Sequence, residues 1–356
     1  MKSLRCHVLF AYSNRIYGVT MESAESNVLL KLDDLHTYFF TEDGVVKAVD
    51  GVTFDVKKGE VLGLVGESGS GKTVTAMSIL SLIPQPPGKI VGGDIIWKGK
   101  SLLNIPESEL RAIRGNHIAV VFQDPMTSLN PVLTIGKQIM EAIILHQQVS
   151  EEEAEDKTIT LLELVGIPDA AKRVADYPWQ FSGGMRQRVM IALALSCNPD
   201  LLIADEPTTA LDVTIQAQVL KLMKGLKDKF STSIILITHD IGVIAEMCDR
   251  VAVMYAGNIV EIGDVYTIFK NPKHPYTEGL LAAIPSVNSK REDELQTIPG
   301  SIPNLISPPS GCRFHPRCSK AMPECSTTVP ATIEVAEGHF VRCLLFEGST
   351  IDGEAK

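Results

Sequence analysis

The sequence predicts an α/β fold organised around one glycine-rich loop, and three observations support this. Residues 66–73 read GESGSGKT, with an apolar run of strand type before them and an apolar pattern of helical spacing after them. Two more short apolar runs, at 201–204 and 233–237, end in side chains that can carry chemistry. Short continuous apolar runs are typical of buried parallel strands, which alternate with helices in α/β proteins.

The composition limits the kinds of protein this can be. The 356 residues leave room for one large domain and an appendage, and 45% hydrophobic with 21% charged residues is typical of a globular chain. A net charge of −10 argues against a nucleic-acid partner. No apolar run approaches the roughly 20 residues that span a bilayer, and residues 1–28 lack the apolar core of a signal peptide. We expect a cytosolic protein with a disordered extension at 1–28, in which Met21 is an alternative start.

The glycine-rich octet has the residues needed to bind phosphate groups. A strand, a glycine-rich turn and a helix N-terminus direct backbone N–H groups and the positive end of a helix dipole at an anion. Lys72 is expected to reach the β- and γ-phosphates of ATP, and the Thr73 hydroxyl to ligate Mg²⁺. The predicted ATP-binding loop consists of Gly66, Glu67, Ser68, Gly69, Ser70, Gly71, Lys72 and Thr73. A chance glycine-rich loop is the alternative, and the rest of the sequence disfavours it.

Upstream of the octet the chain is expected to form strands. Residue type and turn signals predict three strands followed by a hairpin into the loop, at 28–32, 35–40, 48–56 and 57–60. Tyr38, Phe39 and Phe40 lie together ahead of the turn at Gly44. We favour Phe39 as the ring that stacks on adenine. The alternative is core packing, since alternation along a strand turns at least one of the three inward.

A helical insertion is expected between two strands of the nucleotide site. After a predicted hairpin at 92–104, the apolar run 118–122 reads as a strand that ends at Gln123. Apolar residues then recur at helical spacing from 133 to 164. We assign about 126–196 to an α-helical subdomain.

A second helix N-terminus that can bind phosphate is expected at 181–185. Ser182 is a good N-cap, and Gly183 and Gly184 leave backbone N–H groups uncovered at the positive end of the helix; Met185 follows them. Because this helix begins more than 100 positions after the octet, it need not serve the same nucleotide.

Two buried strands deliver polar side chains at their ends. Asp205 and Glu206 follow the apolar run 201–204, and buried carboxylates need partners. Asp205 suits the Mg²⁺ shell, whereas Glu206 suits polarisation of a water that attacks the γ-phosphate. His239 follows the next strand and is expected to hydrogen-bond the γ-phosphate and hold that water. A satisfied core histidine is the alternative for His239.

Together these motifs resemble the nucleotide-binding subunit of an ABC transporter. Residues 66–73 match its Walker A loop, 181–185 its signature and 201–206 its Walker B. The resemblance assigns Gln123 to the Q-loop, Asp212 to the D-loop and His239 to the H-loop, and covers about residues 29–268. It implies a P-loop NTPase with a RecA-like core, an antiparallel β subdomain and the inserted helices. It also implies that Gln123 contributes to Mg²⁺ binding and catalysis. The signature departs from the commonest form, L-S-G-G-Q, at Phe181 and Met185.

A closer resemblance is to the dipeptide/oligopeptide-permease ATPases. It rests on residues 181–190, 205–214 and 271–277. Such a subunit hydrolyses ATP at the cytoplasmic face of the cell membrane to drive peptide uptake. The resemblance implies a heterodimer with a homologous ATPase beneath two transmembrane permease subunits, which receive solute from an extracytoplasmic binding protein. In such an assembly the signature and Asp212 would act on the partner's ATP.

The C-terminal segment, residues 269–356, is expected to be an extension of another kind. From about 284 it is rich in Pro and Ser with little periodicity, which predicts a loop-dominated appendage. Cys312, Cys318, Cys325 and Cys343 lie in this segment, which is too short for its own core, and this indicates a metal staple. A [4Fe–4S] cluster, a zinc ion and free thiols stay open on spacing alone. The family resemblance favours the cluster, with a structural role.

Other functions stay open beside peptide import. Nickel, glutathione and short oligosaccharides are alternative solutes, because other subunits recognise the solute. A soluble ABC protein acting on DNA or ribosomes is disfavoured by the single cassette and the acidic charge. In a third alternative, a redox-sensing regulator, the cluster is primary and ATPase activity secondary.

Overall fold

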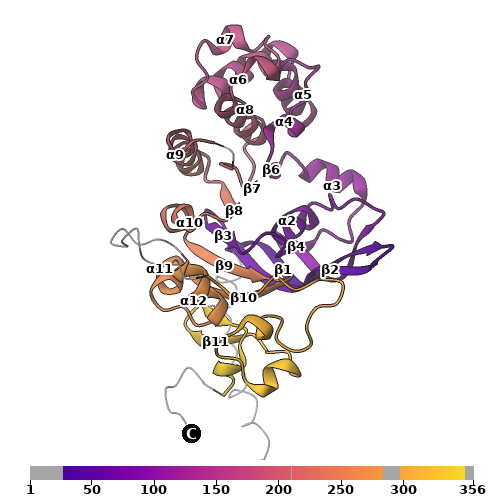
Figure 1. Ribbon diagram of the computed structural model, residues 1–356. Helices are drawn as coiled ribbons and strands as arrows, with labels where there is room; N and C mark the ends of the chain where they lie inside the picture. Colours follow the sequence, from indigo (N-terminus) through magenta and orange to yellow (C-terminus); the bar gives the residue numbers. More distant parts are fainter. Residues whose placement is uncertain (1–26, 210, 284–296, 349–356) are drawn as a thin grey trace, which may run out of the picture.

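The computed structural model describes residues 27–209, 211–283 and 297–348. Figure 1 shows two sheets in the middle of the molecule, a group of helices at one end and the C-terminal segment at the other. Nearly all of the predicted N-terminal extension lies outside the described residues. No helix among the described residues is long and apolar enough to cross a membrane.

The larger sheet holds eight strands in the order β11-β12-β10-β9-β3-β8-β7-β6. Strands β9, β3, β8, β7 and β6 run parallel, and β10, β12 and β11 continue the sheet with antiparallel pairings. The central strands are buried along their whole length, as their apolar sequences predict. The bounds are β3 (Val61–Val65), β6 (Ile118–Val121), β7 (Leu201–Asp205), β8 (Ser233–Ile237), β9 (Arg250–Tyr255), β10 (Asn258–Asp264), β11 (Ile333–Ala336) and β12 (His339–Val341).

The smaller sheet is antiparallel, in the order β2-β1-β4-β5. Its strands are β1 (Val28–Thr41), β2 (Gly44–Lys57), β4 (Gly88–Trp97) and β5 (Lys100–Ser101). The two strands predicted at 28–32 and 35–40 are one strand, because a local irregularity, with Asp34 at φ 49°, bends β1 without ending it. The predicted hairpin at 57–60 is wrong, since β2 and β3 lie in different sheets and this segment crosses between them. The predicted hairpin at 92–104 is confirmed as the pair β4–β5.

Helix α2 (Lys72–Ile79) packs between the two sheets. Its Ala76 and Ile79 share a buried cluster with Leu62 of β3 and Leu30 of β1. This packing fixes where the helix begins, and therefore where the phosphate loop ends. The remaining helices outside the insertion are α3 (Glu107–Ile113), α9 (Val213–Phe230), α10 (Ile241–Met247), α11 (Val265–Lys270) and α12 (Pro275–Ala282).

The predicted helical insertion is present between β6 and β7. Thr134, Ser150 and Ser182 each cap a helix of this group by accepting a hydrogen bond from a backbone N–H three residues later. Short side chains of this type explain why the helices begin where they do. The helices are α4 (Pro125–Ser128), α5 (Ile135–Gln147), α6 (Glu151–Leu164), α7 (Ala170–Arg173) and α8 (Gly183–Leu195), with a 3₁₀ turn η1 (Pro178–Gln180) between α7 and α8.

The C-terminal segment is joined to the rest of the molecule more closely than its sequence suggests. It contributes β11 and β12 to the larger sheet, and Phe314 is buried in the main hydrophobic core. The expectation that loops dominate is confirmed for 297–348, where the only regular elements besides β11 and β12 are three short 3₁₀ turns, whereas the expectation of a separate appendage is wrong. The turns are η2 (His315–Arg317), η3 (Pro323–Ser326) and η4 (Leu344–Phe346). A segment too short for its own core instead packs its apolar side chains into that of its neighbour. The domain boundaries at 28 and 268 remain predictions.

Candidate nucleotide site

The phosphate loop, residues 66–73, connects β3 to α2 in a conformation that requires glycine. Gly66 has φ 155° and Gly71 has φ 107°. A Cβ at Gly66 would lie 2.1 Å from the Met254 carbonyl oxygen, and one at Gly71 would lie 2.3 Å from that of Ala48. Both glycines therefore let the loop pack against the backbone of neighbouring strands.

The side chain of Lys72 folds back onto the phosphate loop. Its Nζ donates hydrogen bonds to the carbonyl oxygens of Gly66 (2.8 Å) and Glu67 (3.0 Å), and the residue is buried. Burial lowers the pKa of Lys72, and the carboxylates of Glu206, Asp205 and Glu67 oppose this shift. The ammonium is thus held at the loop by carbonyl oxygens, which phosphate oxygens can replace.

Asp205 ends β7 as a buried carboxylate, 2% exposed. Its Oδ1 has no hydrogen-bond partner among the described residues. Burial raises the pKa of Asp205, interaction with Thr73 lowers it, and the charge of Glu206 raises it further. A buried carboxylate oxygen without a partner is costly, and a carboxylate with a nearby hydroxyl is the oxygen donor set that Mg²⁺ prefers. These residues fit the predicted Mg²⁺ site.

Gln123, Glu206 and His239 converge from the ends of three strands. The Glu206 Oε2 accepts hydrogen bonds from Gln123 Nε2 and from Thr209 Oγ1, both at 2.9 Å. His239 Nδ1 lies 3.4 Å from Glu206 Oε1, and the His239 side chain is 64% exposed. Two residues predicted separately from the sequence, Gln123 and His239, therefore lie beside the carboxylate of the third. Their catalytic roles remain predictions.

The backbone of Glu206 is in the left-handed region, at φ 46°. A non-glycine residue adopts this conformation only when its surroundings compensate for the strain. Its N–H donates to the Ile237 carbonyl oxygen at 2.9 Å, which continues the ladder between β7 and β8. The backbone therefore changes direction at Glu206, whereas Asp205 still lies within β7. As a result, these two adjacent carboxylates lie in different environments.

The signature residues lie in the helical part of the molecule. Ser182 caps α8 by accepting a hydrogen bond from Met185 N (3.4 Å), as predicted. Beside Gly183 no described atom lies within 4 Å of where a Cβ would be, whereas at Gly184 a Cβ would lie 2.7 Å from Ile215 of α9. Gly184 is thus needed for helix packing, and Gly183 leaves space for a group from outside. In Figure 1, α8 belongs to the helical end of the molecule, whereas the phosphate loop lies by the sheets at the start of α2.

Asp212, which the resemblance assigns to the D-loop, lies at the start of α9. Asp212 caps α9 by accepting a hydrogen bond from Ile215 N (3.0 Å), and Ala210 lies outside the described residues.

Phe39 is partly buried on β1, opposite Val46 and Gly88 of the neighbouring strands. Tyr38 donates a hydrogen bond to Asp50, and Phe40 is half exposed. The adenine contact of Phe39 remains a prediction.

Sequence reasoning missed two residues of the C-terminal segment that contact the phosphate loop. Tyr276 accepts a hydrogen bond from Glu67 N (2.9 Å), and Arg317 donates two to the Glu67 carboxylate. Tyr276 belongs to the segment 271–277 that carries part of the family resemblance, and Arg317 directly precedes Cys318. The only sequence signals for these two residues are the resemblance of the segment 271–277 to the family and the position of Arg317 beside a cysteine.

The four predicted metal-ligating cysteines are grouped near one another. Burial raises the pKa of Cys312, Cys318 and Cys343, that of Cys343 to about 11, and nearby thiols of the same four raise these values further. Cys325 is buried and accepts a hydrogen bond from Met322 N at 3.4 Å. In the described part of the chain, no group of three or more His, Cys, Asp or Glu is placed to hold a metal ion. The predicted metal-stapled extension is thus not supported.

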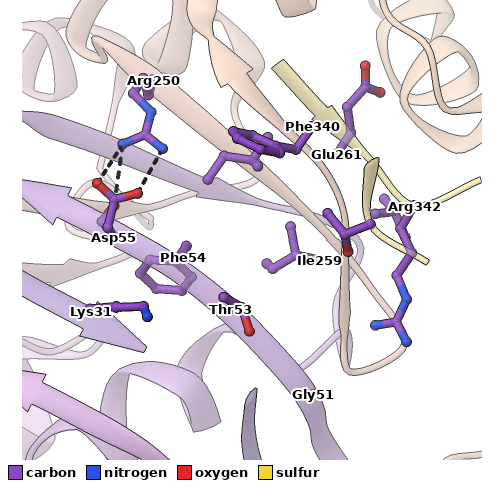
Figure 2. A pocket seen from close by; sticks show the side chains of 13 residues that line it. Lys31, Gly51, Thr53, Phe54, Asp55, Arg250, Ile259, Glu261, Phe340 and Arg342 are labelled. Atoms are coloured by element: carbon purple, nitrogen blue, oxygen red, sulfur yellow. Dashed lines mark hydrogen bonds and ion pairs between the residues drawn. The ribbon is translucent and has the colours of Figure 1, made fainter. Parts of the chain in front are cut away.

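A cavity of about 390 Å³ lies away from the nucleotide site, between β2, β10 and the C-terminal segment. Figure 2 shows Phe54, Ile259 and Phe340 around it, with Arg250 paired to Asp55 at one side. None of the residues predicted to bind ATP lines it. The cavity therefore lies where the C-terminal segment packs against the two sheets.

Comparison with known proteins agrees with this geometry. Residues 49–209 match the family model described as ABC transporter, and residues 260–325 match that of the oligopeptide/dipeptide transporter C-terminal region. The chain is similar to a solved structure of the ATP-binding cassette MJ0796, a dimer in a post-hydrolysis state bound to ADP and Pi. That match has a TM-score of 0.60 and 27% identity, and covers 67% of this chain and 99% of the other. The ABC cassette fold is thereby confirmed.

Two relatives from Bacillus subtilis (strain 168) extend the match over nearly the whole chain. The oligopeptide transport ATP-binding protein AppD is 53% identical over 90% of this chain and 98% of its own length. The oligopeptide transport ATP-binding protein OppD is 54% identical over 89% of this chain and 88% of its own length. The chain therefore belongs to the family of ATP-binding subunits of oligopeptide and dipeptide ABC transporters.

Proposed function

We propose that this chain binds and hydrolyses ATP to drive the import of peptides through membrane subunits. The observation that carries the proposal is the convergence of Gln123 and His239 on the Glu206 carboxylate, in a chain about half identical to oligopeptide transport ATPases. That arrangement has the groups that phosphoryl transfer to water needs.

The phosphate loop would hold the nucleotide. Backbone N–H groups of residues 66–73 and the start of α2 point positive charge at the phosphates, and Lys72 would exchange its contacts with loop carbonyls for β- and γ-phosphate oxygens. Thr73 and Asp205 would ligate Mg²⁺, with Gln123 as a further ligand. When bound, this ion offsets the negative charge of the β- and γ-phosphates. Phe39 would stack on the adenine.

Glu206 would act on the attacking water. Its carboxylate accepts a proton as the water oxygen bonds to the γ-phosphorus, and the bond from that phosphorus to the bridging oxygen breaks to release ADP. Gln123 and Thr209 hold the carboxylate in place, while His239 would hydrogen-bond the γ-phosphate.

A second subunit would complete each ATP site. Ser182, Gly183 and Gly184 begin α8 in the helical part of the molecule, at a distance from this chain's own phosphate loop in Figure 1. We infer that they, Met185 and Asp212 act on ATP held by a homologous ATPase, in a heterodimer at the cytoplasmic face of the membrane. Two permease subunits and a solute-binding protein would supply the peptide.

The test is reconstitution with the permease subunits and partner ATPase in liposomes. We expect uptake of a labelled peptide that requires ATP and is lost in Lys72→Ala, in which binding of the phosphates is weakened. Uptake of nickel, glutathione or an oligosaccharide instead of a peptide would replace the proposed solute. ATPase activity without any co-purifying membrane subunit would favour a soluble role.

We also propose that Cys312, Cys318, Cys325 and Cys343 hold a [4Fe–4S] cluster. One observation supports this: the four thiols lie near one another, close enough that, besides burial, Cys312, Cys318 and Cys325 raise the pKa of Cys343. A four-iron cluster holds its thiolates farther apart than one zinc ion does, so it needs less tightly converging ligands. Its role would be structural.

Metal analysis after anaerobic purification tests this second proposal. We expect brown protein with about four irons per chain, bleached by Cys318→Ser. Cys197→Ser is the matched control, since this half-buried thiol follows α8 and contacts Ala142 of α5, apart from the four cysteines. One zinc per chain in colourless protein would favour a zinc staple, and four freely alkylated thiols in folded protein would reject a metal site.

A further inference from the structure

Arg317 connects the C-terminal segment directly to the phosphate loop. Its guanidinium donates to both carboxylate oxygens of Glu67, from Nη1 to Oε2 at 2.7 Å and from Nη2 to Oε1 at 3.0 Å. Only 6% of the Arg317 side chain and 25% of the Glu67 side chain is exposed. A bidentate, largely buried ion pair of this kind fixes both the position and the orientation of the Glu67 side chain.

Every polar group of Glu67 is engaged. Its N–H donates to Tyr276 Oη at 2.9 Å, and its carbonyl oxygen accepts from Ser70 N (3.1 Å) and Lys72 Nζ (3.0 Å). Two of these partners belong to the loop itself, whereas Tyr276 and Arg317 belong to the C-terminal segment. The second residue of the phosphate loop is therefore held from outside the nucleotide-binding core.

Arg317 is itself fixed by its surroundings. Its Nε donates to the Pro299 carbonyl oxygen at 2.9 Å, and its guanidinium lies 5.7 Å from the centre of the Tyr255 ring. The rings of Tyr255 and Tyr276 pack against Phe314, three residues before Arg317. An arginine held this way loses little side-chain freedom when it pairs with a carboxylate, so the pair is preorganised.

The charge of Glu67 presents a problem at a phosphate-binding loop. Its carboxylate is close enough to Lys72 to affect that group electrostatically, and so it also lies near the place where the phosphates would bind. An unpaired carboxylate there would repel a triphosphate. The Arg317 guanidinium cancels this charge in a part of the molecule that is shielded from solvent.

We propose that Arg317 is a positioning residue for ATP binding: it neutralises Glu67 and holds the phosphate loop in its binding conformation. The C-terminal segment thereby becomes part of the nucleotide site. Since Arg317 precedes Cys318, the fold around the four cysteines determines where its guanidinium lies. The inference rests on the proposed binding of ATP at this loop.

The test is equilibrium binding of a fluorescent ATP analogue to the full chain, with circular dichroism melting of every variant. We expect Arg317→Met to bind at least about tenfold more weakly, because the Glu67 charge is left unpaired. Adding Glu67→Gln should bring the affinity to within about threefold of that of Glu67→Gln alone. Steady-state kinetics should show a raised KM with little change in kcat, the signature of lost uniform binding.

Arg342→Met is the matched control, because Arg342 lies in the same segment and its Nε donates to Pro330, not to the loop. We expect it to bind ATP like the wild type. Equal weakening by Arg342→Met, or no recovery with Glu67→Gln, would mean that general loosening of the segment explains the loss, and would overturn the proposal.

Two further outcomes are informative. If Arg317→Met does not fold, Arg317→Gln replaces it, and wild-type affinity in folded Arg317→Gln would overturn the proposal because an uncharged amide leaves the Glu67 charge unpaired. Absence of nucleotide binding in the wild type would contradict the proposed function. Equal affinity of wild type and Arg317→Met would contradict this inference alone.

Discussion

The side-chain amide of Gln123 donates a 2.9 Å hydrogen bond to the carboxylate of Glu206, although 83 positions separate the two residues in the chain. Gln123 follows β6 and Glu206 follows β7, which are neighbouring parallel strands. The whole helical subdomain lies between them in the sequence. The hydrogen bond therefore connects the residue just before that subdomain with the group proposed to activate water.

Glu206→Gln should abolish hydrolysis while sparing ATP binding. The amide has nearly the same shape and can still meet Thr209, but it cannot accept a proton from water. We expect turnover to fall at least about 100-fold, measured as phosphate release, with the affinity for ATP almost unchanged. Wild-type turnover in the variant would contradict the assignment of Glu206.

Gln123→Ala should reduce transport more than basal hydrolysis. Loss of one hydrogen bond to Glu206 is expected to slow hydrolysis by only about fivefold. Transport should fall further, because the variant also loses the link between the helical subdomain and the carboxylate. Peptide uptake and phosphate release are measured on the same liposomes. An equal loss of both would indicate that Gln123 serves only as a metal or water ligand.

Ser182→Arg should impair hydrolysis in the assembled transporter without weakening ATP binding to the isolated chain. The substitution removes the cap of α8 and places a large side chain beside the open space at Gly183. We expect at least about a tenfold loss of turnover in the assembly. A matched loss of ATP affinity in the isolated subunit would show that the signature serves this chain's own nucleotide.

Asp205→Asn should stabilise the nucleotide-free protein and remove its response to ATP with Mg²⁺. Thr73 and Lys72 offset the burial of the Asp205 carboxylate only in part, and the amide carries no charge to desolvate. We expect a gain of about 1 kcal/mol in unfolding free energy, at the low end for relief of an unpaired buried polar group, seen as a melting temperature about 1–2 °C higher. Adding ATP with Mg²⁺ should raise the melting temperature of the wild type only. A destabilised variant would indicate that Asp205 has a structural partner.

Much of the molecule could be predicted because its signals are local. A glycine-rich loop between a strand and a helix, a serine cap followed by two glycines, and acids directly after an apolar run are each readable in a few residues. Strand ends of a parallel sheet meet at one edge, so the convergence of Gln123, Glu206 and His239 follows from the order of the motifs.

The C-terminal segment could not be predicted in the same way. Its strands are short, and its aromatic and charged side chains find their partners in the nucleotide-binding core. Phe314 in that core, β12 beside β10 and Arg317 on Glu67 are all contacts between distant parts of the chain. The segment has no hydrophobic periodicity from which these long-range contacts could be predicted.

The sequence alone determined the α/β class, the phosphate loop, the two acids and the family, because hydrophobic periodicity and glycine placement act over short stretches of chain. The tertiary structure decided which groups meet across long separations. It pairs Gln123 with Glu206 and leaves Asp205 Oδ1 free of a protein partner within the described residues. It also places Arg317 on the phosphate loop, since side-chain partners are selected by packing and charge after the chain has folded.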